Sequence, residues 1–292
     1  MTDYAGLLRE IAVPRLVGTP NHARVRAALQ RELRARGFAV EEHAFAARPS
    51  RLLLGAPRLV HGVNLVARRP GIPPRVWLTA HYDSKGQPIS MAVRLAGATA
   101  LVLGVAALLV APVAAFVLLA AGGIVLSRNR ATDRSPGAVD NASGVLAALA
   151  IVDRLPRDAP VGLILPDAEE FGLVGARAIA RERPELFRET AVVNFDGLDD
   201  AGRPIAFLHR RGPVGESAGK ALRALRARWL PVVVDGIALA PPARECVTIM
   251  KGGWGTMRVV HTPGDAAERL TLAGVVEVAG GVASVIQQVL RE

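Results

Sequence analysis

The sequence contains almost no cysteine and few aromatic residues. Among 292 residues there is a single cysteine, Cys246, and Phe, Trp and Tyr together make up 4%. One cysteine excludes a disulfide framework and a metal site built from several thiolates. A hydrophobic fraction of 51% beside a charged fraction of 21% excludes a disordered chain. The chain is long enough for a domain with a sizeable core.

Runs of one charge sign are also missing. Lys and Arg number 36 against 26 Asp and Glu, a net charge of +10, but the basic residues are scattered. In nucleic-acid-binding surfaces, basic residues are typically clustered. We therefore expect no nucleic-acid partner, and a basic nucleic-acid binder is the weakest hypothesis. Charged residues interrupt the first fifteen positions, so we expect no cleavable signal peptide.

Charge is absent altogether from one long segment, Leu95–Leu126, which arginines flank on both sides. An apolar run beyond about 18 residues indicates a membrane-embedded segment. A soluble core helix would keep a polar face. Pro112 lies near the middle, where it breaks a helix, so we expect an apolar helical hairpin within residues 91–130. Two helices of about 16 residues reach roughly 24 Å each, less than the ~30 Å hydrocarbon core.

Outside this insert, strand-like and helix-like patterns alternate. Buried strands are predicted at Val76–His81, Val161–Leu165 and Ala191–Phe195. Helical patterns include Gly144–Leu155 and Glu216–Arg228. The alternation predicts a three-layer α/β/α fold with a mixed, mostly parallel central sheet and helices on both faces. No linker divides the chain, so we predict one domain, residues 1–292, interrupted by the hairpin.

Side chains able to bind metal follow several predicted strands or precede helices. The candidates are His81, Asp83, Asp140, Glu169, Glu170, Asp196 and His261, the last closing the pattern MRVVH. Because sites in α/β sheets form beyond the carboxyl ends of the strands, we expect these side chains to converge. Two histidines with several carboxylates suit zinc or a similar divalent ion.

This ordered set resembles peptidase family M28, a family of zinc aminopeptidases. The motifs that carry the resemblance are AHYDS (80–84), GAVDNASG (137–144), PDAEEFGLVGA (166–176), VVNFDG (192–197) and VVHTPGD (259–265). The resemblance covers nearly the whole chain except roughly residues 91–132. It implies two Zn²⁺ ions, with Co²⁺ or Mn²⁺ as other options, bridged by Asp140. His81 and Glu170 would complete the coordination of one ion, and Asp196 and His261 that of the other.

The same resemblance makes Glu169 the general base and gives Asp83 a hydrogen bond that orients the ring of His81. It also implies a cis peptide bond between Asp140 and Asn141. Two such ions would lower the pKa of a bound water toward neutral pH, and Glu169 would take its proton and pass it to the leaving amine. The prediction is a membrane-associated, dinuclear zinc metallo-aminopeptidase that acts on peptides.

Several alternatives stay open. The same scaffold is used for glutaminyl cyclisation, and hydrolysis of other amides is a further option. A non-catalytic membrane adaptor would lack ligands, and none is missing here. The segment Glu245–Val260 follows the family only loosely, so the preferred N-terminal residue is not predicted, nor is the oligomeric state.

The position of the insert limits how it meets a membrane. His81 and Asp140 lie on either side of it and must meet at the metal site, so both ends of the insert lie on the same side of any membrane. We expect membrane lipid to contact residues 95–126. The sequence leaves three arrangements open: the hairpin spans the bilayer, it is re-entrant, or it packs against protein. The flanking arginines predict that the catalytic domain faces the cytoplasm.

Overall fold

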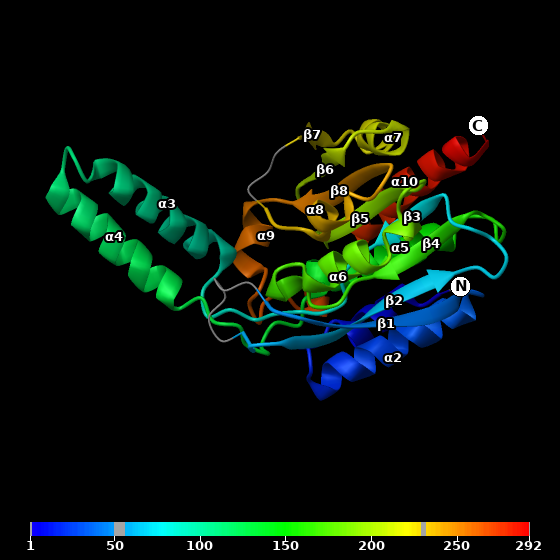
Figure 1. Ribbon diagram of the computed structural model, residues 1–292, viewed down its shortest axis with the longest axis horizontal. Coiled ribbons are helices and arrows are strands. Elements are labelled where there is room, and N and C mark those ends of the chain that lie inside the picture. Colours follow the sequence, from blue (N-terminus) through cyan, green and yellow to red (C-terminus); the bar gives the residue numbers. More distant parts are fainter. Residues whose placement is uncertain (1, 50–55, 229–231, 292) are drawn as a thin grey trace.

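The computed structural model describes residues 2–49, 56–228 and 232–291. Its centre is an eight-stranded sheet in the order β1-β2-β4-β3-β5-β8-β6-β7 (Figure 1). The inner strands β4, β3, β5 and β8 are mutually parallel, and antiparallel pairs flank them. The strands are β1 Ala39–Ala47, β2 Val60–Arg68, β3 Val76–Thr79, β4 Val161–Leu165, β5 Ala191–Leu198, β6 Arg203–Arg210, β7 Leu225–Ala227 and β8 Glu245–Gly252.

Helices cover both faces of the sheet, which confirms the predicted three-layer fold. One face carries α1 Tyr4–Ile11, α2 Pro20–Ala35, α5 Ser143–Val152, α7 Pro213–Ala221 and α10 Ala273–Arg291; the other carries α6 Val174–Glu182 and α8 Asp235–Leu239. Strand β3 shows why both faces are covered. Val76 and Leu78 point into the first core and Trp77 into the second, so apolar side chains of this strand need neighbours on both faces.

The structure differs from the sequence patterns at two places. The pattern Glu216–Arg228 does not form one helix, because α7 ends at Ala221 and Arg223 has a φ of +47°. That left-handed residue turns the chain, which then pairs with β6 as β7. The MRVVH pattern, which His261 closes, is not a strand. It lies at the end of α9, Trp254–Val259, so His261 follows a helix.

The apolar insert forms the expected hairpin. Helices α3, Met91–Ala107, and α4, Pro112–Ser127, lie side by side and project from the domain (Figure 1). Glycines allow the two backbones to approach closely. A Cβ added at Gly122 would lie 2.7 Å from the carbonyl oxygen of Gly97.

One helix in the described part of the chain is long and apolar enough to cross a membrane by length and composition, and it is α10 rather than the hairpin. Along α10, Val275, Val278 and Val282 are buried in the core shared with α5 and α7. It therefore packs as a core helix does. Helices α3 and α4 are apolar but shorter, with 17 and 16 residues.

Candidate metal centre

The candidate residues converge beyond the carboxyl ends of neighbouring parallel strands. His81 and Asp83 follow β3, Glu169 and Glu170 lie in the 3₁₀ turn after β4, and Asp196 lies near the end of β5. These three strands are adjacent in the sheet. The strand order thus brings residues from three distant parts of the chain to one edge of the sheet.

Asp140 comes from the turn that precedes α5. The backbone N–H groups of Val139 and Asp140 donate to the carboxylate of Asp265 at 2.7 and 3.2 Å. The Asp140–Asn141 peptide bond is cis, as the resemblance implied. The Asn141 amide donates to the carbonyl of Phe195 at 2.8 Å, which ties this turn to β5.

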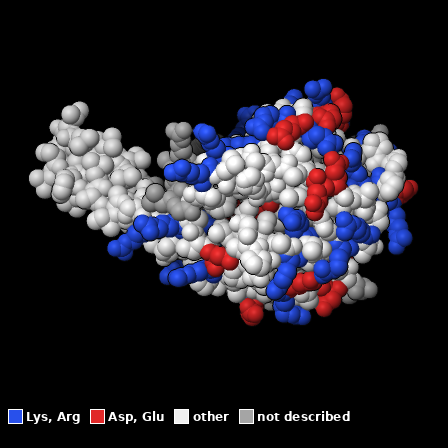
Figure 2. Space-filling view, turned by 60° about the horizontal axis from the view of Figure 1, so that its bottom comes forward, with Lys and Arg blue, Asp and Glu red and all other residues white. Residues whose placement is uncertain are grey.

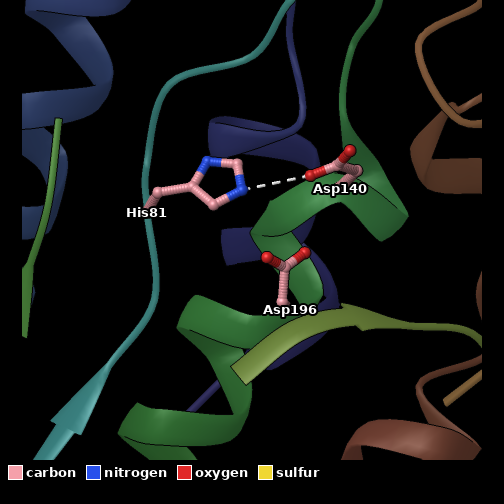
Figure 3. Close-up of side chains that lie close together, drawn as sticks. All are labelled: His81, Asp140 and Asp196. Carbon is pink, nitrogen blue, oxygen red and sulfur yellow. Dashed lines mark ion pairs between the residues drawn. The ribbon is translucent and has the colours of Figure 1, made fainter. Parts of the chain in front are cut away.

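The carboxylate of Asp140 lies between two histidines. Its Oδ1 is 3.1 Å from Nε2 of His81, and its Oδ2 is 3.0 Å from Nε2 of His261. Figure 3 shows Asp140, His81 and Asp196 pointing toward one another. Glu170 joins the other histidine, with Oε1 3.0 Å from Nε2 of His261. Two sets of donor atoms therefore share Asp140, and within each set the atoms lie within 4.8 Å of one another.

This arrangement corrects the pairing that the resemblance suggested. His81 shares its set with Asp196 rather than Glu170, and Glu170 shares its set with His261. The donors suit zinc, which prefers imidazole nitrogen with carboxylate oxygen. Nε2 of His81 and Oε1 of Glu170 are buried and lie at these ion-pair distances, but neither forms a hydrogen bond of good geometry in the described part of the chain. Such orphaned atoms are expected of ligands to an ion.

Asp83 connects the two loops that carry these donors. Its Oδ1 lies 3.3 Å from Nδ1 of His81. Its carboxylate also accepts the backbone N–H groups of Glu169 and Glu170 at 3.1 and 3.2 Å. One buried side chain thus holds the backbone of the adjacent glutamates by hydrogen bonds and lies at ion-pair distance from the imidazole.

The two adjacent glutamates have different electrostatic surroundings. Burial raises the pKa of Glu169 well above its usual value, and the charges of Glu170 and Asp196 raise it further. Burial also raises the pKa of Glu170, but His261 and Lys85 outweigh it and lower that pKa to about 2. The Lys85 ammonium lies 2.9 Å from Oε2 of Glu170. Glu170 is therefore poised as an anionic ligand, and Glu169 as a group that exchanges a proton.

A further acid near the site has no sequence motif. Asp235 begins α8, and both of its carboxylate oxygens are buried without a hydrogen-bond partner in the described ranges. Burial raises its pKa to about 7, and the charges of Asp83 and Glu170 add to the effect. Its charge in turn contributes to the raised pKa of Glu169. The only signal in the sequence is a lone carboxylate within the apolar stretch VVVDGIAL.

Arg15 is a second residue that the sequence analysis missed. Its side chain is almost completely buried, and it donates to the carbonyls of Tyr82 at 2.6 Å and Gly137 at 3.0 Å. It also donates to the carbonyl of Pro136. The guanidinium therefore joins the loop after β3 to the loop that leads into Asp140. Nothing in the local sequence indicates that this residue links the two loops.

Comparison with known proteins now decides the family. A family model described as peptidase family M28 matches residues 64–234, more than half of the chain. The chain belongs to peptidase family M28. The matched M28 region contains every candidate ligand except His261, which lies beyond it. The sequence has no significant match among curated proteins.

Solved structures with the same fold include M28 aminopeptidases and glutaminyl cyclases. The glutaminyl cyclase of Fimbriiglobus ruber is 17% identical, with 97% of this chain and 93% of that chain covered and a TM-score of 0.67. BSAP, a zinc aminopeptidase from Bacillus subtilis, is 13% identical, with 98% and 94% covered and a TM-score of 0.65. The glutaminyl cyclase of Porphyromonas gingivalis is 17% identical, with 98% and 96% covered and a TM-score of 0.66. At these identities the likeness shows the fold alone.

Proposed function

We propose that this M28 protein is a dinuclear zinc metallopeptidase that removes N-terminal residues from peptides. The observation that carries the proposal is the pair of donor sets that share Asp140, with a free carboxyl beside them. Oε2 of Glu169 lies 4.0 Å from Nε2 of His81, yet Glu169 belongs to neither set. We further propose that the chain forms one M28-like domain into which the hairpin is inserted.

Each residue has a distinct role in this proposal. One ion would be held by His81, Asp140 and Asp196, and the other by Asp140, Glu170 and His261. Bound zinc supplies Lewis-acid polarisation of the scissile carbonyl and lowers the pKa of a water molecule.

The proton transfers fall to Glu169. Its carboxylate takes a proton from the attacking water and returns it to the leaving nitrogen. A pKa raised by burial suits a group that first accepts and then donates a proton. Asp83 holds the backbone of Glu169 in place while the proton moves. Asp235, a buried carboxyl outside both donor sets, favours a substrate that brings a free α-amine.

The test combines metal content with turnover. Zinc per chain is counted on detergent-purified protein, and a panel of aminoacyl-chromophore substrates is assayed with and without chelator. Nearly two zinc ions per chain with chelator-sensitive release of the N-terminal residue supports the proposal. Bound zinc without release of any N-terminal residue would refute the aminopeptidase activity, and absence of zinc would favour a non-catalytic adaptor.

Glutaminyl cyclisation is the second candidate, supported by the glutaminyl cyclases among the structures of the same fold. In that reaction the α-amine of an N-terminal glutamine attacks its own side-chain amide and ammonia leaves. Glu169 can move the proton from the amine to the departing ammonia. A peptide with N-terminal glutamine distinguishes the two reactions, because hydrolysis releases free glutamine whereas cyclisation releases ammonia and leaves the peptide bonds intact.

The hairpin supports a proposal of membrane association, with lipid contacting residues 95–126. Its large apolar side chains are open to solvent, with exposed fractions of 97% for Leu109, 73% for Phe116 and 69% for Val102. Figure 2 shows no Lys, Arg, Asp or Glu on the projecting hairpin and several basic residues near its root. Exposed apolar surface of this kind marks a contact with membrane or protein. Basic residues beside it favour the membrane, with the catalytic domain on the cytoplasmic side.

A further inference from the structure

We propose that the active site opens at the level of the lipid headgroups, so that its substrates are peptide N-termini held at a membrane surface. The proposal rests on the peptidase function and lipid contact proposed above. It adds where the site lies relative to the bilayer, and which peptides can reach it.

The root of the hairpin contacts a candidate metal ligand. The Arg94 guanidinium, in the first turn of α3, lies 2.6 Å from Nδ1 of His261. Just before α3, the backbone N–H of Gln87 donates to the carbonyl of His261 at 2.7 Å. Gly86 and Thr132 close the root through two backbone hydrogen bonds of 2.7 and 2.8 Å. The hairpin is therefore held against the site itself rather than attached by a loose linker.

Helix α9 joins the same region. It packs against α3 and lies between the hairpin and the sheet (Figure 1). Its first residue, Trp254, is 63% exposed, and its last, Val259, is two positions before His261. Tryptophan is enriched at membrane–water interfaces, where its ring lies among the headgroups. The exposed Trp254 at the root of the apolar hairpin therefore favours a position of the root at the level of the headgroups.

The charge of Arg94 limits how far the protein can enter the bilayer. A guanidinium in hydrocarbon is costly, so the hydrocarbon boundary lies beyond Arg94 on α3. From Arg94 to Val102, the first large apolar side chain of α3 that is more than half exposed, the helix rises about 12 Å. Because Arg94 contacts His261, the site lies within about 15 Å of the hydrocarbon.

The length of the hairpin indicates that it enters the bilayer without crossing it. The apolar parts of α3 and α4 rise roughly 20 to 24 Å, against a hydrocarbon core of ~30 Å. Both ends then return to the same surface, beside the site. A re-entrant hairpin holds the site at a fixed height above the bilayer. A soluble peptide can reach a site at any height, whereas a membrane-bound N-terminus can reach only a site close to the membrane.

Tethering a substrate to the same surface raises its effective concentration at the site. An extended chain spans at most about 3.5 Å per residue, so roughly four residues bridge the distance from lipid to site. We expect an anchored peptide with a short spacer to show at least a tenfold higher kcat/KM than the free peptide, through a lower KM. The advantage should decline when the spacer grows to about thirty residues.

The experiment uses the full chain, loaded with zinc, in vesicles of neutral and anionic phospholipid. Peptides with the same N-terminal sequence are compared free, with a C-terminal acyl anchor on a short spacer, and with the anchor on a long spacer. A short-spacer preference supports the inference. Chelator-sensitive cleavage of all three at equal kcat/KM would overturn it and leave the peptidase function standing. Failure to cleave any of them would overturn both.

A matched pair of variants separates lipid contact from folding. Leu109→Lys combined with Val113→Lys changes two exposed residues of the hairpin tip region, whereas Val276→Lys changes an exposed residue on α10. The hairpin variant should keep cleavage of the free peptide and lose the preference for the anchored one, and Val276→Lys should keep both. An unchanged preference in the hairpin variant would contradict the inference.

A second readout needs no activity. Fluorescence of the protein is recorded with vesicles whose lipids carry bromine either near the headgroup or deep in the acyl chain. Quenching by the shallow bromine that disappears in Trp254→Phe places this tryptophan at the interface. Quenching that is the same in Trp254→Phe, or absent, would contradict the proposed height of the site.

Discussion

Asp83 accepts a 3.1 Å hydrogen bond from the backbone N–H of Glu169, the residue proposed as general base. The same carboxylate lies 3.3 Å from the ring of His81. It thus links the base, through its backbone, to a candidate ligand of the metal.

Asp83→Asn should weaken zinc binding about 10- to 100-fold, the usual cost of losing a partner that orients a metal ligand. An amide at this position presents one oxygen instead of two to the backbone donors and the imidazole. Competition with a chromophoric chelator measures the affinity. Glu268→Gln, at an exposed acid, is the control and should bind zinc normally. Equal affinities in the two variants would contradict the role of Asp83.

Glu169→Gln should retain zinc and lose turnover by roughly 10²- to 10⁴-fold, because the amide cannot take up the proton. Asp140→Ala should instead lose zinc, since both donor sets include Asp140. Metal analysis and kcat on the same samples separate the two outcomes. Wild-type turnover in Glu169→Gln would refute the mechanism.

Arg15→Met should lower the free energy of unfolding by at least ~2 kcal/mol, because buried carbonyls lose their donor. Arg15→Lys should recover only part of the loss, since an ammonium cannot reproduce the planar set of donors. Denaturant unfolding with and without zinc measures the effect. Arg24→Met, at an exposed position of α2, is the control and should remain within about 0.5 kcal/mol of wild type.

Asp153 should contribute stability that depends on pH. Burial raises its pKa, but hydrogen bonds from Arg36 and Tyr4 outweigh burial and lower the pKa below its usual value. A lowered folded-state pKa stabilises the protein above the unfolded-state value of about 3.9, and this stability is lost as the pH falls through the folded-state pKa. The difference in unfolding free energy between wild type and Asp153→Asn should therefore be constant from about pH 5 to 7 and shrink below about pH 4.

The matched control for this pH series is Asp158→Asn, at an exposed position nearby. It should show little difference from wild type at any pH in the series. A difference for Asp153→Asn that does not change between about pH 3 and 7 would contradict the electrostatic origin of its stability.

Replacing residues 95–126 with a short polar linker should move the protein from the membrane fraction to the soluble fraction. The domain should stay folded, because the hairpin helices pack mainly on each other. Cell fractionation and circular dichroism measure the two effects. A folded deletion variant that remains in the membrane fraction would refute lipid anchoring by the hairpin.

The sequence by itself was sufficient for the features that depend on neighbouring residues. The apolar insert was recognisable because charge is absent over its whole length, and Pro112 predicted where it divides into two helices. The buried strands of the inner sheet were recognisable as continuous apolar runs. The candidate ligands were found because each lies within a short motif.

Only the tertiary structure decided which of these residues face one another. Glu170 lies beside His261, and His81 beside Asp196, because the segments that carry these four residues meet at Asp140. Arg15 and Asp235 stayed hidden for the same reason: a buried charge takes its role from partners far away in the sequence. Periodicity also could not show that Arg223 ends α7, or that His261 follows a helix. Long-range packing and loop geometry decide such contacts, and a local pattern does not encode them.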